Sequence, residues 1–183
     1  MSDAADRRFM AMALALAERG LGNVWPNPTV GCVLVKDGHV VGRGWTQPGG
    51  RPHAETEAIA RAGAAAARGS TAYVTLEPCV HHGRTPPCTD AMLTAGIARA
   101  VIAIPDPDPR VDGRGIARLR AAGMEVAVGC LAEEARRQND GFFLRVGQGR
   151  PAVSLKLATS ADGRIATATG ESQWITEIGR AHV

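Results

Sequence analysis

Hydrophobic and polar positions follow two different periods along the chain, and these periods predict two kinds of element. Apolar residues recur every three or four positions over residues 6–19, which predicts a helix, and Gly20 stands where a C-terminal cap belongs. Two valine-rich runs, 30–35 and 40–45, flank the turn signal Asp37-Gly38 and predict a β-hairpin. The chain is therefore expected to open with a helix followed by two paired strands.

Strand and helix patterns alternate after this hairpin. The resulting order implies a mixed sheet with helices on both faces, which is a three-layer α/β fold. We assign the alanine run 64–67 to the end of the helix before it. The expected helices are 53–63, 88–94, 113–122 and 131–146, and the expected strands are 71–76, 101–104 and 125–128.

Composition narrows the class of protein. The chain has 183 residues, enough for one ordinary domain and a further fragment. The formal charge of +3 comes without a basic run interleaved with aromatics, so we expect no nucleic-acid partner. Acidic and basic residues interrupt the N-terminus and no apolar segment approaches the ~20 residues of a membrane span, so we expect neither a signal peptide nor a membrane partner. Cys32 and Cys130 are expected to be buried thiols in a reducing compartment, which favours a cytoplasmic location.

Four residues carry metal chemistry. His53, Cys79 and Cys88 make three protein ligands for a tetrahedral Zn²⁺ and leave the fourth position open for water, which is typical of a catalytic zinc. Such a zinc brings the pKa of its water near ~7. Two thiolates already balance the metal's charge, so Glu55 is better placed as a proton carrier than as a fourth ligand.

The motif H-x-E followed by P-C and a second cysteine is the arrangement of zinc nucleobase deaminases, in which the glutamate is the general acid and base. One alternative is a buried histidine with two unrelated core thiols. Another is a zinc-stabilised binding module without catalysis, although a structural site normally closes with a fourth histidine or cysteine.

The expected elements bring these groups to one rim of the sheet. Cys79 is expected at the tip of the strand that begins at Thr71, and Cys88 opens a helix whose positive N-terminus favours a thiolate. His53 and Glu55 fall in the first turn of another helix. Asn27 lies between two prolines, and both a turn role and a role as a ligand amide remain open for it.

The spacing of the cysteines narrows the family. Cytidine and tRNA-adenosine deaminases typically hold the pair as P-C-x-x-C, whereas here residues 80–87 separate Cys79 from Cys88. The segments 75–79 and 81–88, together with 26–31 and His53-Ala54-Glu55, resemble the deaminase half of the bifunctional riboflavin-biosynthesis deaminase/reductase family (RibD type). The resemblance covers residues 6 to about 177.

This resemblance implies a cytidine-deaminase-like fold and zinc-dependent hydrolytic deamination of a diaminohydroxy-(phosphoribosylamino)pyrimidine, a small-molecule substrate that resembles a pyrimidine ribonucleotide. The main alternative is a cytidine or deoxycytidylate deaminase. The resemblance implies His53, Cys79 and Cys88 as zinc ligands, Glu55 as the catalytic proton carrier, and Asn27, His81 and Arg84 as substrate contacts. For Arg84 a second role is open, in which it holds its own loop through hydrogen bonds to carbonyl groups.

The loop 105–109 departs from the family pattern. The family usually reads Asp-Pro-Asn-Pro there, and this chain has Asp108 in place of the asparagine. An extra negative charge would weaken contact with a phosphate or base, so we expect this loop to lie outside the site.

Residues 1–149 are thus expected to form the deaminase domain, and residues 150–183 resemble the opening of a dihydrofolate-reductase-like reductase domain. By this resemblance, Ala158 and Trp174 would contact NADPH and Ser172 the ribityl substrate. The segment is far shorter than the ~100–150 residues of a typical domain, so we expect NADPH to bind only if a complete reductase domain were present. We expect this segment to be poorly ordered or packed against another chain, and a homo-oligomer is compatible with the sequence.

Overall fold

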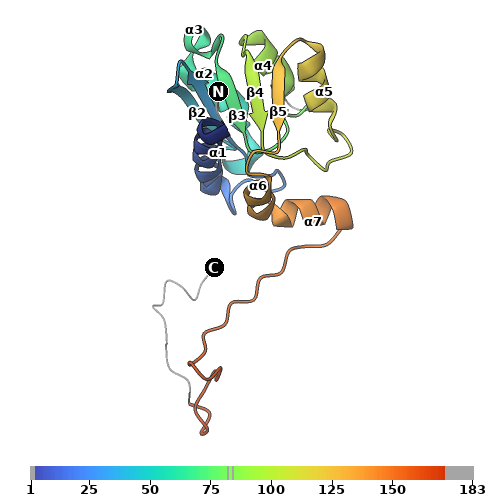
Figure 1. Ribbon diagram of the computed structural model, residues 1–183. Coiled ribbons are helices and arrows are strands. Elements are labelled where there is room, and N and C mark those ends of the chain that lie inside the picture. The colour runs from blue at the N-terminus through green and yellow to red at the C-terminus, as the bar shows by residue number, and fades with distance from the viewer. Residues whose placement is uncertain (1–2, 82, 84, 172–183) are drawn as a thin grey trace. The chain divides into compact units, whose positions relative to one another are not determined.

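A computed structural model describes residues 3–81, 83 and 85–171 (Figure 1). The chain divides into two units, Met1–Pro151 and Ala152–Val183. The first unit contains a five-stranded sheet in the order β2-β1-β3-β4-β5. The strands are β1 (Gly31–Lys36), β2 (His39–Trp45), β3 (Thr71–Val74), β4 (Arg99–Ile102) and β5 (Glu125–Val128).

The sheet is mixed, as the order of elements predicts. Strand β1 pairs antiparallel with both β2 and β3, whereas β3, β4 and β5 run parallel to one another. The hairpin β1–β2 turns at Asp37 and Gly38, both of which have positive φ. The predicted hairpin and mixed α/β sheet are confirmed.

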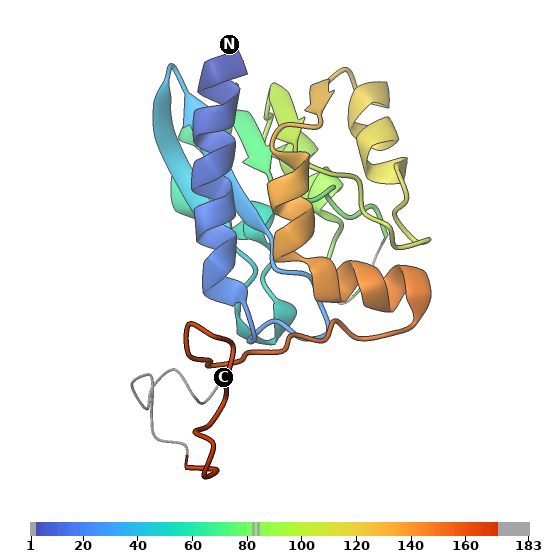
Figure 2. The ribbon, with the colours of Figure 1, turned by 60° about the horizontal axis from the view of Figure 1, so that its bottom comes forward.

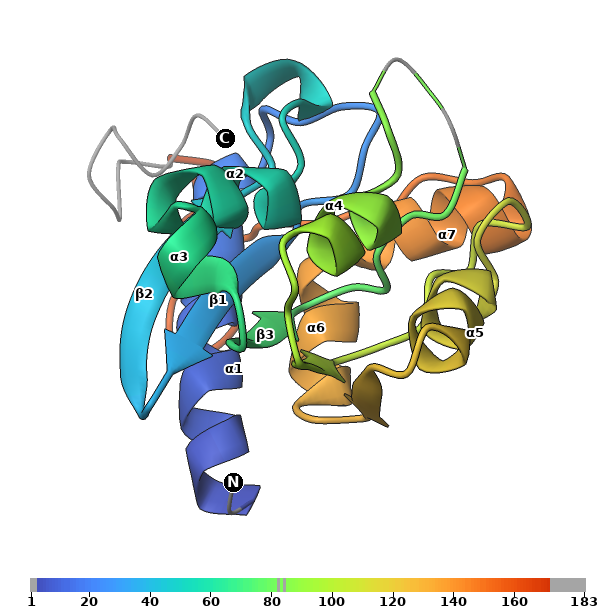
Figure 3. The same cartoon turned by 90° about the horizontal axis from the view of Figure 1, so that it is seen from above.

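Helices cover both faces of this sheet. On one face lie α1 (Asp3–Ala17) and α6 (Ala132–Gln138), which stand side by side in Figure 2. On the other face lie α2 (Ala54–Ala62), α4 (Cys88–Thr94) and α5 (Arg114–Ala121), and Figure 3 shows α2 next to α4. These three layers confirm the expected architecture. The remaining helices of the described chain are η1 (Glu18–Gly20), η2 (Pro48–Gly50), α3 (Ala64–Ala67) and α7 (Asp140–Gln148).

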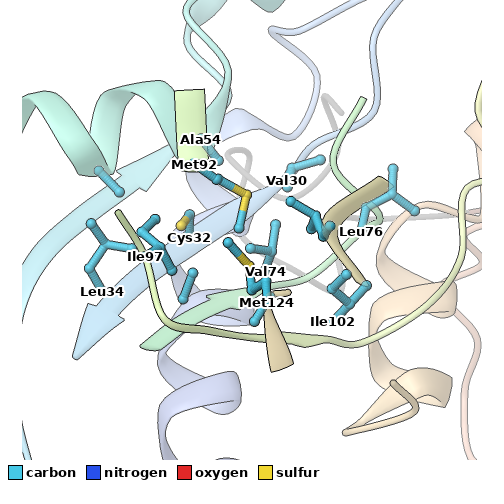
Figure 4. Close-up of a cluster of buried hydrophobic side chains, with 14 of the residues drawn as sticks. Val30, Cys32, Leu34, Ala54, Val74, Leu76, Met92, Ile97, Ile102 and Met124 are labelled. Carbon is cyan, nitrogen blue, oxygen red and sulfur yellow. The ribbon is translucent and has the colours of Figure 1, made fainter. Parts of the chain in front are cut away.

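Two hydrophobic clusters hold the layers together, and the side-chain alternation of the strands separates them. In β1, Cys32 and Leu34 point into the cluster beneath α2 and α4 (Figure 4). Val33 and Val35 point the opposite way, into the cluster beneath α1. Because both faces are covered, the strand is an almost continuous apolar run.

Helix α2 approaches β2 unusually closely because β2 carries glycines at the contact. A Cβ atom on Gly44 would lie 2.1 Å from the carbonyl oxygen of Ala54, and one on Gly42 would lie 2.4 Å from that of Ala58. Any side chain there would push the helix away. The two glycines therefore set the position of the helix that carries Glu55.

The predicted helix 131–146 is wrong as a single element. It is two helices, α6 and α7, separated at Asn139, whose φ of −114° is not helical. The side chain of Asn139 receives a hydrogen bond from Thr29 N (2.9 Å) and donates one to Thr29 O (2.9 Å). The asparagine at the break therefore binds the backbone of a residue that is distant in sequence. Helical periodicity alone cannot reveal such a contact.

Smaller corrections concern element ends. Strand β3 stops at Val74, so Cys79 lies five residues beyond it and not at its tip. Strand β4 covers 99–102, two residues earlier than expected. The alanine run 64–67 is a separate short helix, because Gly63 has a φ of 75° that ends α2.

Within residues 152–171 the second unit has turns but no helix or strand. Ser160 anchors one turn, receiving a hydrogen bond from Gly163 N at 2.9 Å and donating one from its own N–H to Arg164 O at 2.9 Å. Among the described residues, no helix combines the length and apolarity needed to cross a bilayer.

Candidate active site

Three structural elements bring the predicted metal ligands together. His53 is the N-cap of α2, with an extended backbone (φ −72°, ψ 159°). Cys88 is the first residue of α4, as predicted. Cys79 lies in the loop after β3, and its carbonyl oxygen accepts a hydrogen bond from Thr89 N at 3.2 Å. This bond ties the loop to the start of α4 and sets the two cysteines beside each other.

The geometry of these three side chains suits a tetrahedral metal. His53 Nδ1 lies 3.3 Å from Cys88 Sγ and 3.7 Å from Cys79 Sγ. All three potential ligand atoms lie within 4.8 Å of one another. Zinc bonds of ~2.0–2.3 Å at tetrahedral angles require ligand atoms about 3.5–4 Å apart. The residues present therefore fit zinc.

The surroundings favour a thiolate at Cys79. Hydrogen bonds from the Cys88 thiol, and then from His53, lower the pKa of Cys79 to about 4 against the opposing effect of burial. The backbone N–H of Cys88 also donates to Cys79 Sγ at 3.3 Å. This N–H belongs to the first turn of α4, where helical N–H groups have no partner within the helix.

Glu55 lies beside this cluster, in the first turn of α2, and is only 4% exposed. Burial raises the pKa of its carboxyl group. No arginine or lysine among the described residues forms an ion pair with it. A buried carboxyl group without a permanent cation can exchange a proton.

Glu55 lines a cavity of about 220 Å³ together with His53 and Cys79 of the metal cluster. Asn27 and His81, two of the predicted substrate contacts, also line it. The Asn27 side chain donates from Nδ2 to Gly50 O at 2.8 Å, so its amide is held, and no described residue donates a hydrogen bond to its Oδ1. Nδ1 of His81 is buried and has no hydrogen-bond partner within the described parts of the chain.

Glu77 is a buried residue of this region whose role the sequence analysis missed. Its Oε2 accepts hydrogen bonds from Asp106 N (3.1 Å) and Gly113 N (3.0 Å), and its Oε1 accepts one from Ile116 N (3.0 Å). It thereby joins the loop after β4 to the start of α5. A glutamate directly before Pro78-Cys79 offered a signal, but its partners lie 29 to 39 residues away.

The loop 105–109, which we expected to lie outside the site, in fact lines the cavity through Asp106 and Asp108, and Arg110 directly after it lines the cavity too. Burial raises the pKa of Asp106 to about 6, whereas Arg110 lowers that of Asp108 to about 2. The charge of Asp108 is paired with Arg110, two residues further along the chain. This short spacing is a signal that the sequence already contains.

Helix α7 also contributes to the cavity wall, through Phe142, Arg145 and Val146. Arg145 donates from Nη2 to Pro26 O at 2.7 Å and stacks on the Trp25 ring, with 4.8 Å to its centroid. These residues lie more than fifty positions after Cys88, and no local sequence motif connects them to the site. Only the folded chain shows that α7 faces the site.

Several predicted residues cannot be placed in this cavity. Arg84, Ser172 and Trp174 lie outside the described residues. Ala158 belongs to the second unit, in a segment without helix or strand. The assignments of these four residues stay predictions.

The fold and the site together define a class of protein. Residues 3–104 match the family described as the cytidine and deoxycytidylate deaminase zinc-binding region, and the chain belongs to this family. This span holds His53, Cys79 and Cys88, as well as the first four strands of the sheet.

Relatives narrow the comparison further. The chain is 56% identical over 171 residues to the riboflavin biosynthesis protein RibD of Escherichia coli, covering 93% of this chain and 46% of the relative. RibD of Aquifex aeolicus is 52% identical over 171 residues, with 93% and 48% covered. The chain thus spans about half the length of these relatives.

Solved structures that resemble this chain belong to the same group of proteins as these relatives. Acinetobacter baumannii RibD, form 1, is 47% identical, with a TM-score of 0.86 over 98% of this chain and 50% of that one. The Thermotoga maritima diaminohydroxyphosphoribosylaminopyrimidine deaminase/5-amino-6-(5-phosphoribosylamino)uracil reductase is 45% identical, with a TM-score of 0.88 over 96% and 50%. These matches confirm the cytidine-deaminase-like fold and the predicted resemblance to the deaminase/reductase family.

Proposed function

We propose that this chain catalyses the hydrolytic deamination of a diaminohydroxy-(phosphoribosylamino)pyrimidine, a step of riboflavin biosynthesis. The observation that carries this proposal is the cluster of His53, Cys79 and Cys88 beside a buried Glu55 at a cavity. The name of the Thermotoga maritima relative states the same deamination for that protein.

We assign the zinc to His53, Cys79 and Cys88. Their separations and donor types suit a site with three protein ligands. Zinc bound in this way supplies a Lewis acid that activates water at neutral pH. A fourth protein ligand is absent from the cluster among the described residues, which leaves space for a small molecule.

Glu55 is assigned as the proton carrier. Its carboxylate would accept a proton from the attacking water and deliver it to the ring nitrogen of the pyrimidine. It would then take the remaining proton of the added hydroxyl group and pass it to the departing amine, while the ring carbon becomes a carbonyl. Water thereby adds to the ring carbon, the carbon–nitrogen bond breaks, and ammonia leaves. Burial next to the cluster supports this role, because the carboxyl group is shielded from bulk water.

Asn27 and His81 are assigned to the pyrimidine base. Asn27 is anchored through Nδ2 to Gly50, which leaves Oδ1 to accept from a base N–H group. His81 Nδ1 is buried without a described partner, and a bound base would supply one. Arg84, carried over from the family resemblance, remains the proposed phosphate contact.

We propose that residues 150–183 are the start of a dihydrofolate-reductase-like domain, in which Ala158 and Trp174 would meet NADPH and Ser172 the ribityl substrate. Deamination would not need this segment, because all the described residues that line the cavity lie between Pro26 and Val146. A chain ending at Gly149 should therefore deaminate at the rate of the full chain. Loss of deamination after this deletion would contradict the separation.

The metal assignment is tested with Cys79→Ser. This variant should lose bound zinc and thermal stability together, because metal binding contributes to folding. Zinc content by atomic absorption and thermal unfolding measure both effects. Cys130→Ser is the control, since Cys130 lies outside the cluster. A Cys79→Ser protein that kept one zinc per chain would overturn the assignment.

The activity is tested by ammonia release from the purified, zinc-loaded full chain. The substrates are the diaminohydroxy-(phosphoribosylamino)pyrimidine, cytidine and deoxycytidylate at equal concentrations. We expect turnover of the first compound and little of the other two. Preferred turnover of cytidine or deoxycytidylate would replace the proposed substrate, and ammonia release from none of them would reject the function.

A further inference from the structure

The loop after β4 places a charged pair at the wall of the cavity. Asp108 and Arg110 both line the cavity, together with His81. The Asp108 side chain is 13% exposed, whereas that of Arg110 is 70% exposed. The carboxylate is therefore largely enclosed, and the guanidinium covers it from the solvent side.

The contact between the two side chains is extensive. Arg110 Nε donates to both carboxylate oxygens of Asp108, at 3.0 and 3.1 Å, and Nη2 donates to Oδ2 at 2.6 Å. The backbone N–H of Arg110 adds a bond of 2.9 Å to Oδ1. Hydrogen bonds from Arg110 are the main cause that lowers the pKa of Asp108 to about 2, so the carboxylate stays ionised at neutral pH.

An ionised carboxylate at this wall matters because the proposed substrate carries a phosphate. A carboxylate facing a phosphate at short range repels it, and this repulsion is stronger beside a partly desolvated cavity than in water. A guanidinium bound to the carboxylate cancels most of the field of that charge. The pair then presents a nearly neutral surface to the substrate.

We propose that Arg110 determines specificity for a phosphorylated substrate by neutralising Asp108 at the cavity wall. This inference rests on the proposed function, because that function supplies the phosphate. Arg110 acts here through Asp108 and without touching the phosphate itself. It is therefore a positioning and charge-compensating residue, and its effect depends on the presence of the aspartate.

The test measures binding of two ligands, the diaminohydroxy-(phosphoribosylamino)pyrimidine and its dephosphorylated form, by calorimetry. The zinc-loaded full chain carries Glu55→Gln in every sample, so that turnover during the titration is strongly reduced. Arg110→Gln should weaken binding of the phosphorylated ligand by about tenfold and that of the dephosphorylated one by less than about twofold.

The double variant Asp108→Asn/Arg110→Gln should restore affinity for the phosphorylated ligand to within about threefold of the parent, because the repelling charge is gone. Asp108→Asn alone should bind this ligand at least as tightly as the parent. Asparagine keeps the oxygen that accepts the Arg110 N–H, so the loop should hold its conformation. Arg118→Gln is the matched control, since Arg118 pairs with Asp90 and does not line the cavity.

Three results would overturn the inference. Equal weakening of both ligands by Arg110→Gln would indicate a general loop effect. A double variant as weak as Arg110→Gln would indicate direct contact between Arg110 and the phosphate. Weaker phosphate binding by Asp108→Asn would show that the aspartate attracts the substrate.

Failure of the proposed function has a separate signature. If the chain with native Glu55 released no ammonia while the variants still followed the expected order of affinity, deamination would be rejected and the role of Arg110 retained. If the chain deaminated the substrate but the variants did not follow the expected order of affinity, the role of Arg110 would be rejected and deamination retained. Absence of binding by either ligand would reject both.

Discussion

Asp6 and Glu55 are both buried carboxyl groups of the first unit, but the chain treats their charges differently. Asp6 receives hydrogen bonds from Arg99 Nη1 (2.9 Å), Arg99 Nη2 (2.8 Å) and the Tyr73 hydroxyl (2.8 Å). These bonds, those from Arg99 foremost, lower the pKa of Asp6. No described arginine or lysine pairs with Glu55, and burial raises its pKa.

This difference in charge partners distinguishes a carboxylate that stabilises the fold from one that is suited to proton transfer. Asp6 connects α1 to β3 and β4, and its charge is permanently matched, so it serves stability. Glu55 is buried beside the proposed zinc ligands and forms no ion pair with an arginine or lysine of the described chain. Burial without such a pair is typical of functional sites, where a group must change its protonation state during a reaction.

The strongest test of this comparison is Glu55→Gln. General acid–base groups contribute about 10²–10⁴-fold to turnover, so kcat for ammonia release should fall by at least ~10²-fold. Zinc content should stay at the level of the native chain, and the thermal unfolding temperature should stay at that level or rise, because glutamine preserves the shape of the side chain without its buried charge. Near-native turnover in this variant would remove Glu55 from the mechanism.

Asp6→Asn should give the opposite result. Asp6→Asn leaves the largely buried Arg99 with only the exposed Glu125 as its charged partner, at a cost of about 3 kcal/mol in the free energy of unfolding. Urea denaturation measures this loss, and kcat should be unchanged. Glu125→Gln is the control, because Glu125 pairs with the same Arg99 but its side chain is 71% exposed. Its effect should stay below about 1 kcal/mol.

The pH dependence sharpens the same contrast. The folded-state pKa of Asp6 lies below its ordinary value of 3.8, so the stabilisation is fully present above that value and is lost as the pH falls through the folded-state pKa. The stability difference between the native chain and Asp6→Asn should be constant from pH 7 to about 5 and narrow below about 4. Urea denaturation of the metal-free proteins across this range measures it. A difference that persisted unchanged at pH 3 would contradict the ionic origin.

A neutral buried contact provides a smaller effect for comparison. Asn139→Ala leaves the N–H and carbonyl groups of Thr29 without their partner, which should cost about 1–3 kcal/mol. Because Thr29 is close to Asn27 in sequence, KM should rise more than kcat falls. Asn23→Ala, at an exposed side chain, should change stability by less than about 0.5 kcal/mol. If both variants were equally stable, the Asn139–Thr29 contact would not hold the loop.

Local patterns predicted most of the elements but not all their ends. Side chains on β1 alternate between two covered faces, so a run of apolar residues indicated a buried strand. The break at Asn139 escaped prediction because helix periodicity continues on both sides of it. What interrupts the helix is a pair of hydrogen bonds with Thr29, 110 residues away.

By itself, the sequence determined the chemistry of the site: His53, Cys79 and Cys88 are metal-binding types at a diagnostic spacing, and Glu55 follows the histidine at a fixed offset. Side-chain chemistry and short spacings need no tertiary information. Only the folded structure decided which groups surround that centre. Arg145 from α7 and the Asp108–Arg110 pair reach the cavity because helices and strands distant in sequence pack together, and no local pattern records such contacts.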